Sequence, residues 1–183
     1  MLRIFILLIG SFLLQTSPLK ASPSPASPQP DSITVYLFLH DACIICQNYS
    51  LTINELHEEF AGTHLEFIGL FPNFASKPEA IAAYKKKYHI PFALKTDYFR
   101  TMTQKLGATI TPEVFVYNQT REKILYRGRI DNTYVALGRK RHSASTSELR
   151  DALQAIRSGQ QVAVSQTKAV GCLINANDRL GQQ

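Results

Sequence analysis

The sequence predicts an α/β domain of three layers, in which helices cover a mixed central sheet. Two observations indicate this class. An apolar strand expected at 34–39 runs directly into two cysteines two residues apart and then into a long amphipathic helix. Further along the chain, helices alternate with strands, and a hairpin and a last helix follow. No internal repeat is visible, so a single core is expected.

Composition agrees with one domain of ordinary size that carries tails. The chain has 183 residues, of which 45% are hydrophobic, and this is enough to form a core. The formal net charge is +6, and removal of the first 21 residues, which hold Arg3 and Lys20 but no acid, would leave 18 minus 14, or +4. This mild excess predicts no nucleic-acid partner, and the basic run 139–142 is interpreted as a solvated loop.

The N-terminus is predicted to direct export. Arg3 precedes a mostly apolar run at 4–14, and Ala21 is a small residue suited to cleavage. A membrane span needs about 20 apolar residues, so an uncleaved anchor is the weaker alternative. We expect a signal peptide at 1–21, a Pro/Ser-rich linker at 22–30 and a domain at 31–159 that lies in the periplasm or outside the cell.

Each element of the domain has a local signal in the sequence. The first helix is expected from about Cys43 to Phe60, with Gly62 ending it. Ser76 is expected to cap the second helix, which has Pro78 in its first turn and runs to residue 88. The other elements are expected as strands at 65–71, 90–95, 113–117 and 124–128, helices at 98–106 and from 146 or 147 to about 157, and an irregular stretch at 131–145.

The paired cysteines, Cys43 and Cys46, carry the predicted chemistry. Cys43 would lie at the start of a helix, where unpaired backbone N–H groups and the positive end of the helix dipole favour the thiolate. Cys46, one turn further on, would be close enough to attack a mixed disulfide formed at Cys43. A stabilising disulfide or half of a metal site is the alternative, but the chain has no second CxxC and no closely spaced histidine pair. No cofactor and no metal are expected.

Two segments together resemble the thioredoxin-like superfamily: FLHDACIIC, and TPEVFVY with its isolated Thr-Pro. The extra strand and helices between Pro72 and Gly107 are similar to the insertion of the redoxin branch, which includes exported thiol-disulfide oxidoreductases. The resemblance covers 31–159 and implies a strand-helix insertion before a cis-proline, Pro112, that faces the cysteines. It also implies that Thr111 and Pro112 offer backbone groups to an extended segment of a partner protein.

The chain departs from thioredoxins proper at two places. Ile44 and Ile45 stand between the cysteines where those proteins have Gly-Pro, so their redox potential cannot be carried over. Leu37 replaces the buried acid that they place six residues before the first cysteine. Another proton acceptor is then needed, and His40 and Asp41 are the available groups.

The resemblance implies an exported thiol-disulfide oxidoreductase, expected to be a monomer, whose partners are proteins with disulfides or dithiols. Two alternatives remain open. A thiol peroxidase is less favoured because His40 stands where the peroxiredoxin signature Pro-x-x-x-Thr-x-x-Cys has its threonine. A copper-binding chaperone on the same fold is less favoured because such proteins use Cys-x-x-x-Cys and a distant histidine, and the spacing here is one residue shorter.

A third cysteine, Cys172, lies in the tail expected at 160–183. An unpaired thiol in an exported protein calls for a reason. One interpretation is a small buried hydrophobe between Val170 and Leu173. In the other, the tail folds back, Gly171 lets the backbone approach another surface closely, and Cys172 exchanges with Cys43 as an internal substrate, a relay thiol or a resolving thiol. The segment resembles a C-terminal Gly-Cys element of some exported redoxin-domain proteins.

Overall fold

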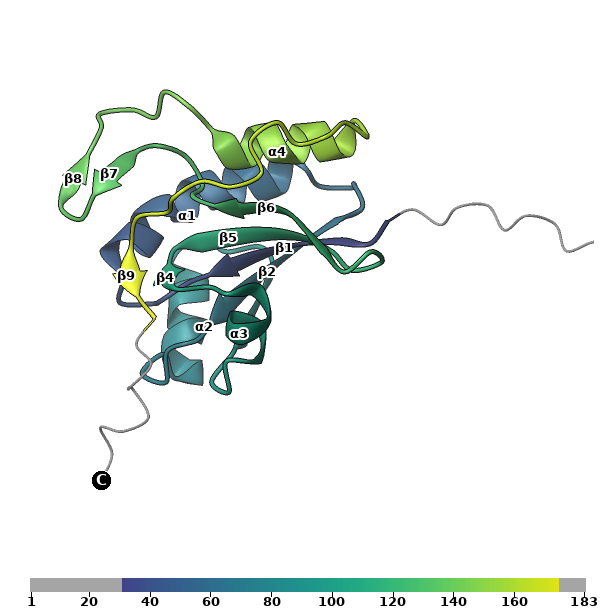
Figure 1. Ribbon diagram of the computed structural model, residues 1–183. Helices are drawn as coiled ribbons and strands as arrows, with labels where there is room; N and C mark the ends of the chain where they lie inside the picture. The colour runs from purple at the N-terminus through teal and green to yellow at the C-terminus, as the bar shows by residue number, and fades with distance from the viewer. Residues whose placement is uncertain (1–30, 175–183) are drawn as a thin grey trace, which may run out of the picture.

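The computed structural model describes residues 31–174, so the expected signal peptide and the whole of the expected linker lie outside the described part. Five strands form a mixed sheet in the order β3-β2-β1-β5-β6 (Figure 1). Their bounds are Ile33–Phe38 for β1, Leu65–Phe71 for β2, Ala93–Thr96 for β3, Glu113–Asn118 for β5 and Lys123–Gly128 for β6. The fold class expected from the sequence is therefore confirmed.

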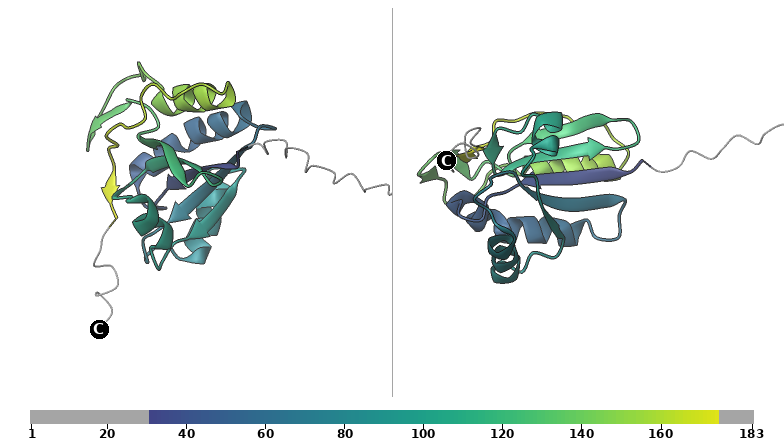
Figure 2. Two further views of the ribbon diagram at one scale, coloured as in Figure 1. Left: turned by 45° about the vertical axis from the view of Figure 1, so that its right-hand side comes forward. Right: turned by 90° about the horizontal axis from the view of Figure 1, so that it is seen from below.

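Helices cover both faces of this sheet. Helices α1 (Ile44–Glu59), α2 (Pro78–Lys87) and α4 (Glu148–Arg157) pack into the larger hydrophobic core. Helix α3 (Thr101–Leu106) contributes to a second core on the opposite face. Figures 1 and 2 show α1 and α4 side by side, and Arg150 on α4 forms an ion pair with Glu59 at the end of α1. No helix within residues 31–174 is both long and apolar enough to cross a bilayer.

Strand β1 is the middle strand of the sheet, and its apolar side chains fit this position because both faces of a middle strand are buried. Val35 and Leu37 point into the larger core, whereas Tyr36 and Phe38 point into the second one. The strand pairs in parallel with β2 and antiparallel with β5, and its last residue, Phe38, lies opposite Glu113. This register places the end of β1 beside the start of β5.

Two local predictions about helix starts are wrong. Ser76 does not cap α2, because its hydroxyl instead donates a hydrogen bond to the carboxylate of Asp41, and Lys77 takes the N-cap position. Helix α3 begins at Thr101, three residues later than expected, because the Asp97 carboxylate accepts hydrogen bonds from the N–H groups of Met102 and Thr103. In both places a side chain from outside the helix decides where it begins.

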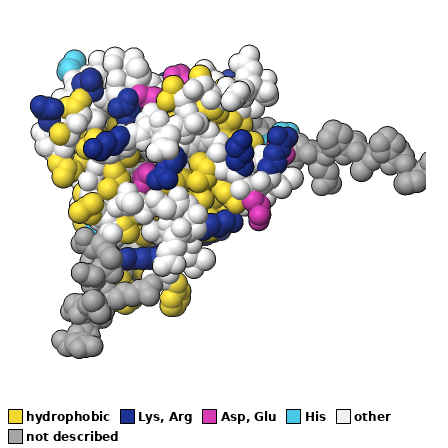
Figure 3. All heavy atoms as spheres, viewed as in Figure 1, with side chains coloured by type: hydrophobic (Ala, Val, Ile, Leu, Met, Phe, Trp, Pro, Cys, Tyr) yellow, Lys and Arg dark blue, Asp and Glu magenta, His cyan; other side chains and the backbone are white. Residues whose placement is uncertain are grey.

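The strand expected at 90–95 is also shifted, and it forms as β3 at Ala93–Thr96. Ile90 and Phe92 are buried in the larger core instead of pairing in the sheet. The stretch expected to be irregular contains a short hairpin, β7 (Tyr134–Ala136) and β8 (Arg139–Lys140). Its basic residues are exposed as expected, and Figure 3 shows Lys and Arg side chains among hydrophobic ones at the left of the view, over this hairpin.

The segment after α4 returns along the domain. The Arg127 N–H on β6 donates to the carbonyl of Ser165 (2.9 Å), and the Thr167 N–H donates to the carbonyl of Arg127 (3.0 Å). The chain then forms β9 (Cys172–Leu173), which pairs antiparallel with β4 (Ile110–Thr111). Figure 1 shows this segment in yellow, passing from α4 across β6 to the start of α1.

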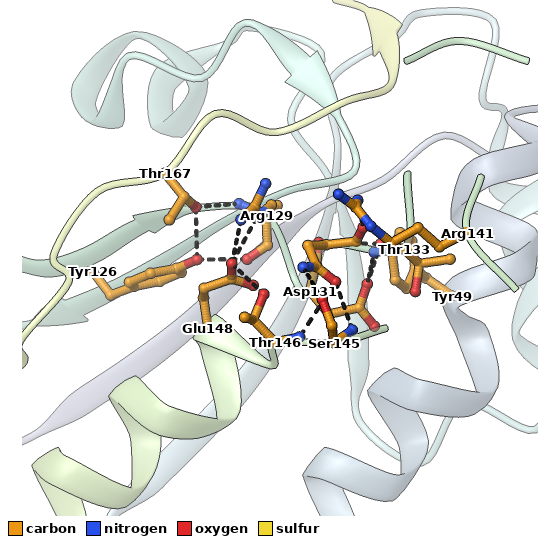
Figure 4. A network of polar contacts seen from close by, with 11 residues as sticks. Tyr49, Tyr126, Arg129, Asp131, Thr133, Arg141, Ser145, Thr146, Glu148 and Thr167 are labelled. Carbon is orange, nitrogen blue, oxygen red and sulfur yellow. Dashed lines mark hydrogen bonds and ion pairs between the residues drawn. The ribbon is translucent and has the colours of Figure 1, made fainter. Parts of the chain in front are cut away.

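A network of polar side chains fixes this return (Figure 4). The Thr167 hydroxyl lies 2.9 Å from the Tyr126 hydroxyl and accepts a hydrogen bond from the Arg129 N–H (3.0 Å). Arg129 in turn forms an ion pair with Glu148 at the start of α4. Backbone and side-chain contacts at Thr167 thus attach the returning segment to β6 and α4.

We expect Gly128→Ala to destabilise the protein more than Gly62→Ala. Both glycines have positive φ, 135° and 73° respectively, so alanine strains the backbone at either position. A Cβ at residue 128 would also collide with Thr167, whereas a Cβ at residue 62 meets nothing within 4 Å. The loss in unfolding free energy, measured by urea denaturation, should be about 1 kcal/mol for Gly62→Ala and at least about 2 kcal/mol for Gly128→Ala. Equal losses would contradict the close approach of the two segments.

Candidate active site

Cys43 lies where β1 has ended and α1 begins. Its N–H donates to the carbonyl of His40 (3.1 Å), which closes a tight turn, and its own carbonyl accepts from the N–H of Gln47 (3.0 Å). Cys43 is therefore the N-cap residue of α1, although its side chain makes no cap hydrogen bond. The thiol is buried and stands at the end of the helix where backbone N–H groups are unpaired.

This position stabilises negative charge on Cys43. The thiol of Cys46 and then that of Cys172 hydrogen-bond to the Cys43 sulfur, and the N–H groups of Cys46 and Ile45 add to them. Together they outweigh burial and lower the pKa of Cys43 to about 5. Cys43 is thus a thiolate at neutral pH in the reduced protein.

Cys46 has the opposite character. It is completely buried on the first turn of α1 and lies 3.7 Å from Cys43. Burial, and then the hydrogen bond to Cys43 and its negative charge, raise the pKa of Cys46 well above its usual value. The pair therefore consists of one thiolate and one thiol that donates a hydrogen bond to it.

Thr111 and Pro112 face this pair from the start of β5. The peptide bond between them is cis, and the Thr111 carbonyl oxygen lies 3.5 Å from Cys43 Sγ. Thr111 is completely buried. The Glu113 carboxylate, which follows directly, accepts hydrogen bonds from the Thr109 N–H (3.0 Å) and from Arg127 (3.2 Å). These contacts hold the 109–113 stretch in place beside Cys43.

The returning segment brings the third cysteine into the same site. Cys172 lies opposite Thr111 in the β4–β9 pair, and its Sγ is 2.7 Å from Cys43 Sγ. Neither sulfur atom belongs to a disulfide, and the two are in direct contact. Burial, and then the hydrogen bond to Cys43, raise the pKa of Cys172 to about 12. Cys172 therefore keeps its proton and also donates a hydrogen bond to the Cys43 thiolate.

The two residues considered as proton acceptors are placed differently. The side chain of Asp41 is engaged by the Ser76 hydroxyl. His40 accepts the Ala42 N–H at Nδ1 (3.0 Å) and lines a cavity of about 450 Å³ together with Cys43 and Cys172. Of the two, only His40 lines the space that leads to the sulfur atoms.

Sequence reasoning missed two other residues of this cavity, Leu137 and Asn73. Leu137 lies between β7 and β8 and is 67% exposed, in a stretch where no strand was expected. Asn73 is buried, and its Oδ1 has no hydrogen-bond partner among the described residues. The Pro72-Asn73 pair was visible in the sequence only as a turn signal after β2.

We expect iodoacetamide to alkylate Cys43 of the reduced protein with a rate that is half-maximal near pH 5, because only the thiolate reacts. Removal of a hydrogen bond to that thiolate raises its pKa, so Cys172→Ala should move the midpoint upward and Cys46→Ala should move it further. Cys172→Ser is the matched control, because a serine hydroxyl can still donate and should restore part of the shift. Mass spectrometry of the alkylated peptide measures the rate. A midpoint near the ordinary cysteine value of about 8.5 in the unmodified protein would refute this electrostatic description.

Comparisons with known proteins give the fold. No protein-family profile and no curated protein match this chain. A hypothetical protein, SMc02350 from Sinorhizobium meliloti 1021, matches with a TM-score of 0.68 and 22% identity over 78% of this chain and 79% of that one. An uncharacterized conserved protein from Geobacillus kaustophilus matches with a TM-score of 0.70 and 22% identity over 79% and 77% of the two chains. StoA from Bacillus subtilis matches with a TM-score of 0.47 and 13% identity over 55% and 75%. The strand order of the central sheet, with a strand-helix insertion between β2 and β5, is that of a thioredoxin-like fold, as the sequence predicts.

Proposed function

We propose that this protein is an exported thiol-disulfide oxidoreductase that exchanges disulfides with partner proteins through Cys43 and Cys46. The observation that carries the proposal is that two adjacent cysteines lie in environments that shift their pKa values in opposite directions. Cys43 is a thiolate at a helix start, and Cys46, 3.7 Å away, is a buried thiol. A nucleophile and a resolving group are therefore already within reach of each other.

The exchange runs in two steps. The Cys43 thiolate attacks one sulfur of a partner disulfide, a mixed disulfide forms, and the other partner sulfur leaves as a thiolate. Cys46 then loses its proton and attacks Cys43 Sγ. This step forms the Cys43–Cys46 disulfide and releases the second partner sulfur. The partner gains two electrons, and its two sulfur atoms become thiols by taking up the proton that Cys46 gave up and one proton from water. The reverse sequence oxidises the partner.

Formation of the mixed disulfide also changes the state of Cys46. While Cys43 is a thiolate, its hydrogen bond and charge hold the proton on Cys46. A covalent bond at Cys43 removes that charge, so the pKa of Cys46 falls just when Cys46 must become the nucleophile. His40, which lines the cavity, is the proposed acceptor of its proton.

Thr111 and Pro112 are proposed to receive the partner. An extended segment that pairs with the backbone at Thr111 would have its sulfur near Cys43, because the Thr111 carbonyl oxygen is 3.5 Å from Cys43 Sγ. Export is supported by the apolar run at 4–14, which lies outside the described residues. The compartment outside the cytosol is where protein disulfides persist.

We expect a Cys46→Ala variant to accumulate mixed disulfides with partner proteins, whereas Cys43→Ala should accumulate none. The nucleophile is intact in the first variant and absent in the second. Because Cys172 lies against Cys43 and could release a trapped partner, both variants should be made in a Cys172→Ser background. Non-reducing electrophoresis followed by mass spectrometry identifies the captured proteins.

Equal trapping by the two variants would overturn the assignment of roles. Rapid peroxide consumption by the reduced protein would instead favour the thiol peroxidase. Stoichiometric copper bound by the reduced protein and lost in Cys43→Ser would favour the copper chaperone.

A further inference from the structure

Strand β9 occupies the backbone edge that the proposed function gives to a partner protein. Cys172 lies opposite Thr111, and the Thr111 hydroxyl donates to the Cys172 carbonyl (3.4 Å). Beyond the strand, the Ile174 N–H donates to the carbonyl of Thr109 (2.9 Å). An incoming segment needs the same backbone groups, so it cannot pair here while β9 is in place.

Gly171 shows that this fit is close. A Cβ at residue 171 would collide with the carbonyl group of Thr111 and lie 3.0 Å from the nitrogen of Pro112. These atoms belong to the backbone, which cannot move aside as a flexible side chain can. The residue before Cys172 must therefore be glycine for β9 to lie against β4 as it does.

The sulfur atoms meet within this pairing. Cys43 Sγ and Cys172 Sγ are 2.7 Å apart, so no other atom separates them. Cys172 is only partly buried, whereas Cys43 and Cys46 are both buried. Cys172 thus stands where the sulfur of a bound partner would stand, on the open side of Cys43.

We propose that residues 171–173 are a built-in substrate segment, which occupies the partner-binding edge and whose Cys172 exchanges with the Cys43–Cys46 disulfide to form a Cys43–Cys172 disulfide. This inference rests on the proposed function, which supplies the Cys43–Cys46 disulfide. Cys172 as a thiolate attacks Cys43 Sγ, the Cys43–Cys46 bond breaks, and Cys46 leaves as a thiolate that takes up the proton Cys172 gave up. One disulfide replaces another, so no further oxidant is needed.

The segment then acts at two stages of the cycle. In the reduced protein it covers Cys43, and a partner must displace β9 before it can bind. In the oxidised protein it converts the buried Cys43–Cys46 disulfide into a Cys43–Cys172 disulfide and leaves Cys46 as a free thiol. The seated segment selects for partners that can compete with it for the backbone at Thr111.

The first test maps disulfides in the full chain. Purified protein is equilibrated with a mixture of reduced and oxidised glutathione, quenched with acid and labelled with N-ethylmaleimide, and the linked peptides are identified by mass spectrometry. We expect a measurable Cys43–Cys172 fraction with labelled Cys46. In Gly171→Ala this fraction should fall about tenfold or more, because β9 can no longer seat. Ser165→Ala is the matched control, because its exposed side chain is lost while the backbone carbonyl that binds Arg127 is kept.

A second variant tests the same contact in case Gly171→Ala does not fold. Ile174→Pro removes the N–H that donates to Thr109 without altering Gly171 or Cys172. It should lower the Cys43–Cys172 fraction in the same direction. The inference is overturned if the wild type forms no Cys43–Cys172 disulfide, or if both variants, folded by circular dichroism, form as much as the wild type.

The second test measures exchange between the reduced protein and insulin, with oxidised glutathione as a small disulfide for comparison. Unseating β9 should speed exchange with insulin about tenfold in Gly171→Ala, and change exchange with glutathione less. Equal insulin rates in wild type and variant would refute the blocking role while the proposed function stands. Absence of insulin exchange in every variant, with the Cys43–Cys172 link present, would instead refute the proposed function alone.

Discussion

The antiparallel register between β1 and β5 is the constraint on which the site depends. Because Phe38 lies opposite Glu113, the loop that leaves β1 toward Cys43 and the Thr111–Pro112 turn that enters β5 meet at the same end of the sheet. A slip of one residue would exchange the two faces of β1 and move its side chains between the two cores. The alternation of buried residues on both faces, Val35 and Leu37 against Tyr36 and Phe38, makes such a slip costly. Packing in the sheet thus determines the geometry of the sulfur atoms at its edge.

The returning segment is held by much weaker forces than the sheet. Between its attachment at Thr167 and its end at Ile174, only Ala169 is buried among the described residues. Val170, Cys172 and Ile174 are only partly buried against the two cores, and its other contacts are mainly backbone hydrogen bonds. Such sparse packing is typical of parts of a protein that open without global unfolding. We therefore expect β9 to leave β4 more readily than β1, β5 or α1 lose their positions.

The sequence predicts the parts of this protein whose structure is determined locally. An apolar strand followed by a cysteine pair and an amphipathic pattern was enough to place β1 and α1, and Gly107 marks the end of α3. The error at the start of α2 arises because a residue distant in the chain competes for a side chain. Serine is a residue type that often caps helices, but the Ser76 hydroxyl donates its hydrogen bond to Asp41, 35 residues away in sequence.

The same reason left the role of Cys172 open. The two interpretations, a buried hydrophobe or a tail that folds back, depend on whether residues near 172 meet residues near 111, and no local pattern encodes that pairing. The β7–β8 hairpin was missed for a similar reason. The loops on either side of it are joined by the Asn132 side chain, which accepts from the Ser145 N–H (2.9 Å).

The attachment at Thr167 also makes the exchange between Cys172 and Cys43 intramolecular. Only four residues, 168–171, separate the anchored Thr167 from Cys172, and a short tether of this kind maintains an effective concentration in the millimolar range or above. A partner protein present at micromolar concentration would then have to bind about a thousandfold more tightly than the untethered segment in order to replace it. A partner whose disulfide is accessible but which binds weakly would therefore be excluded. The affinity that a partner needs would be set by the length of this tether more than by the chemistry of the cysteines.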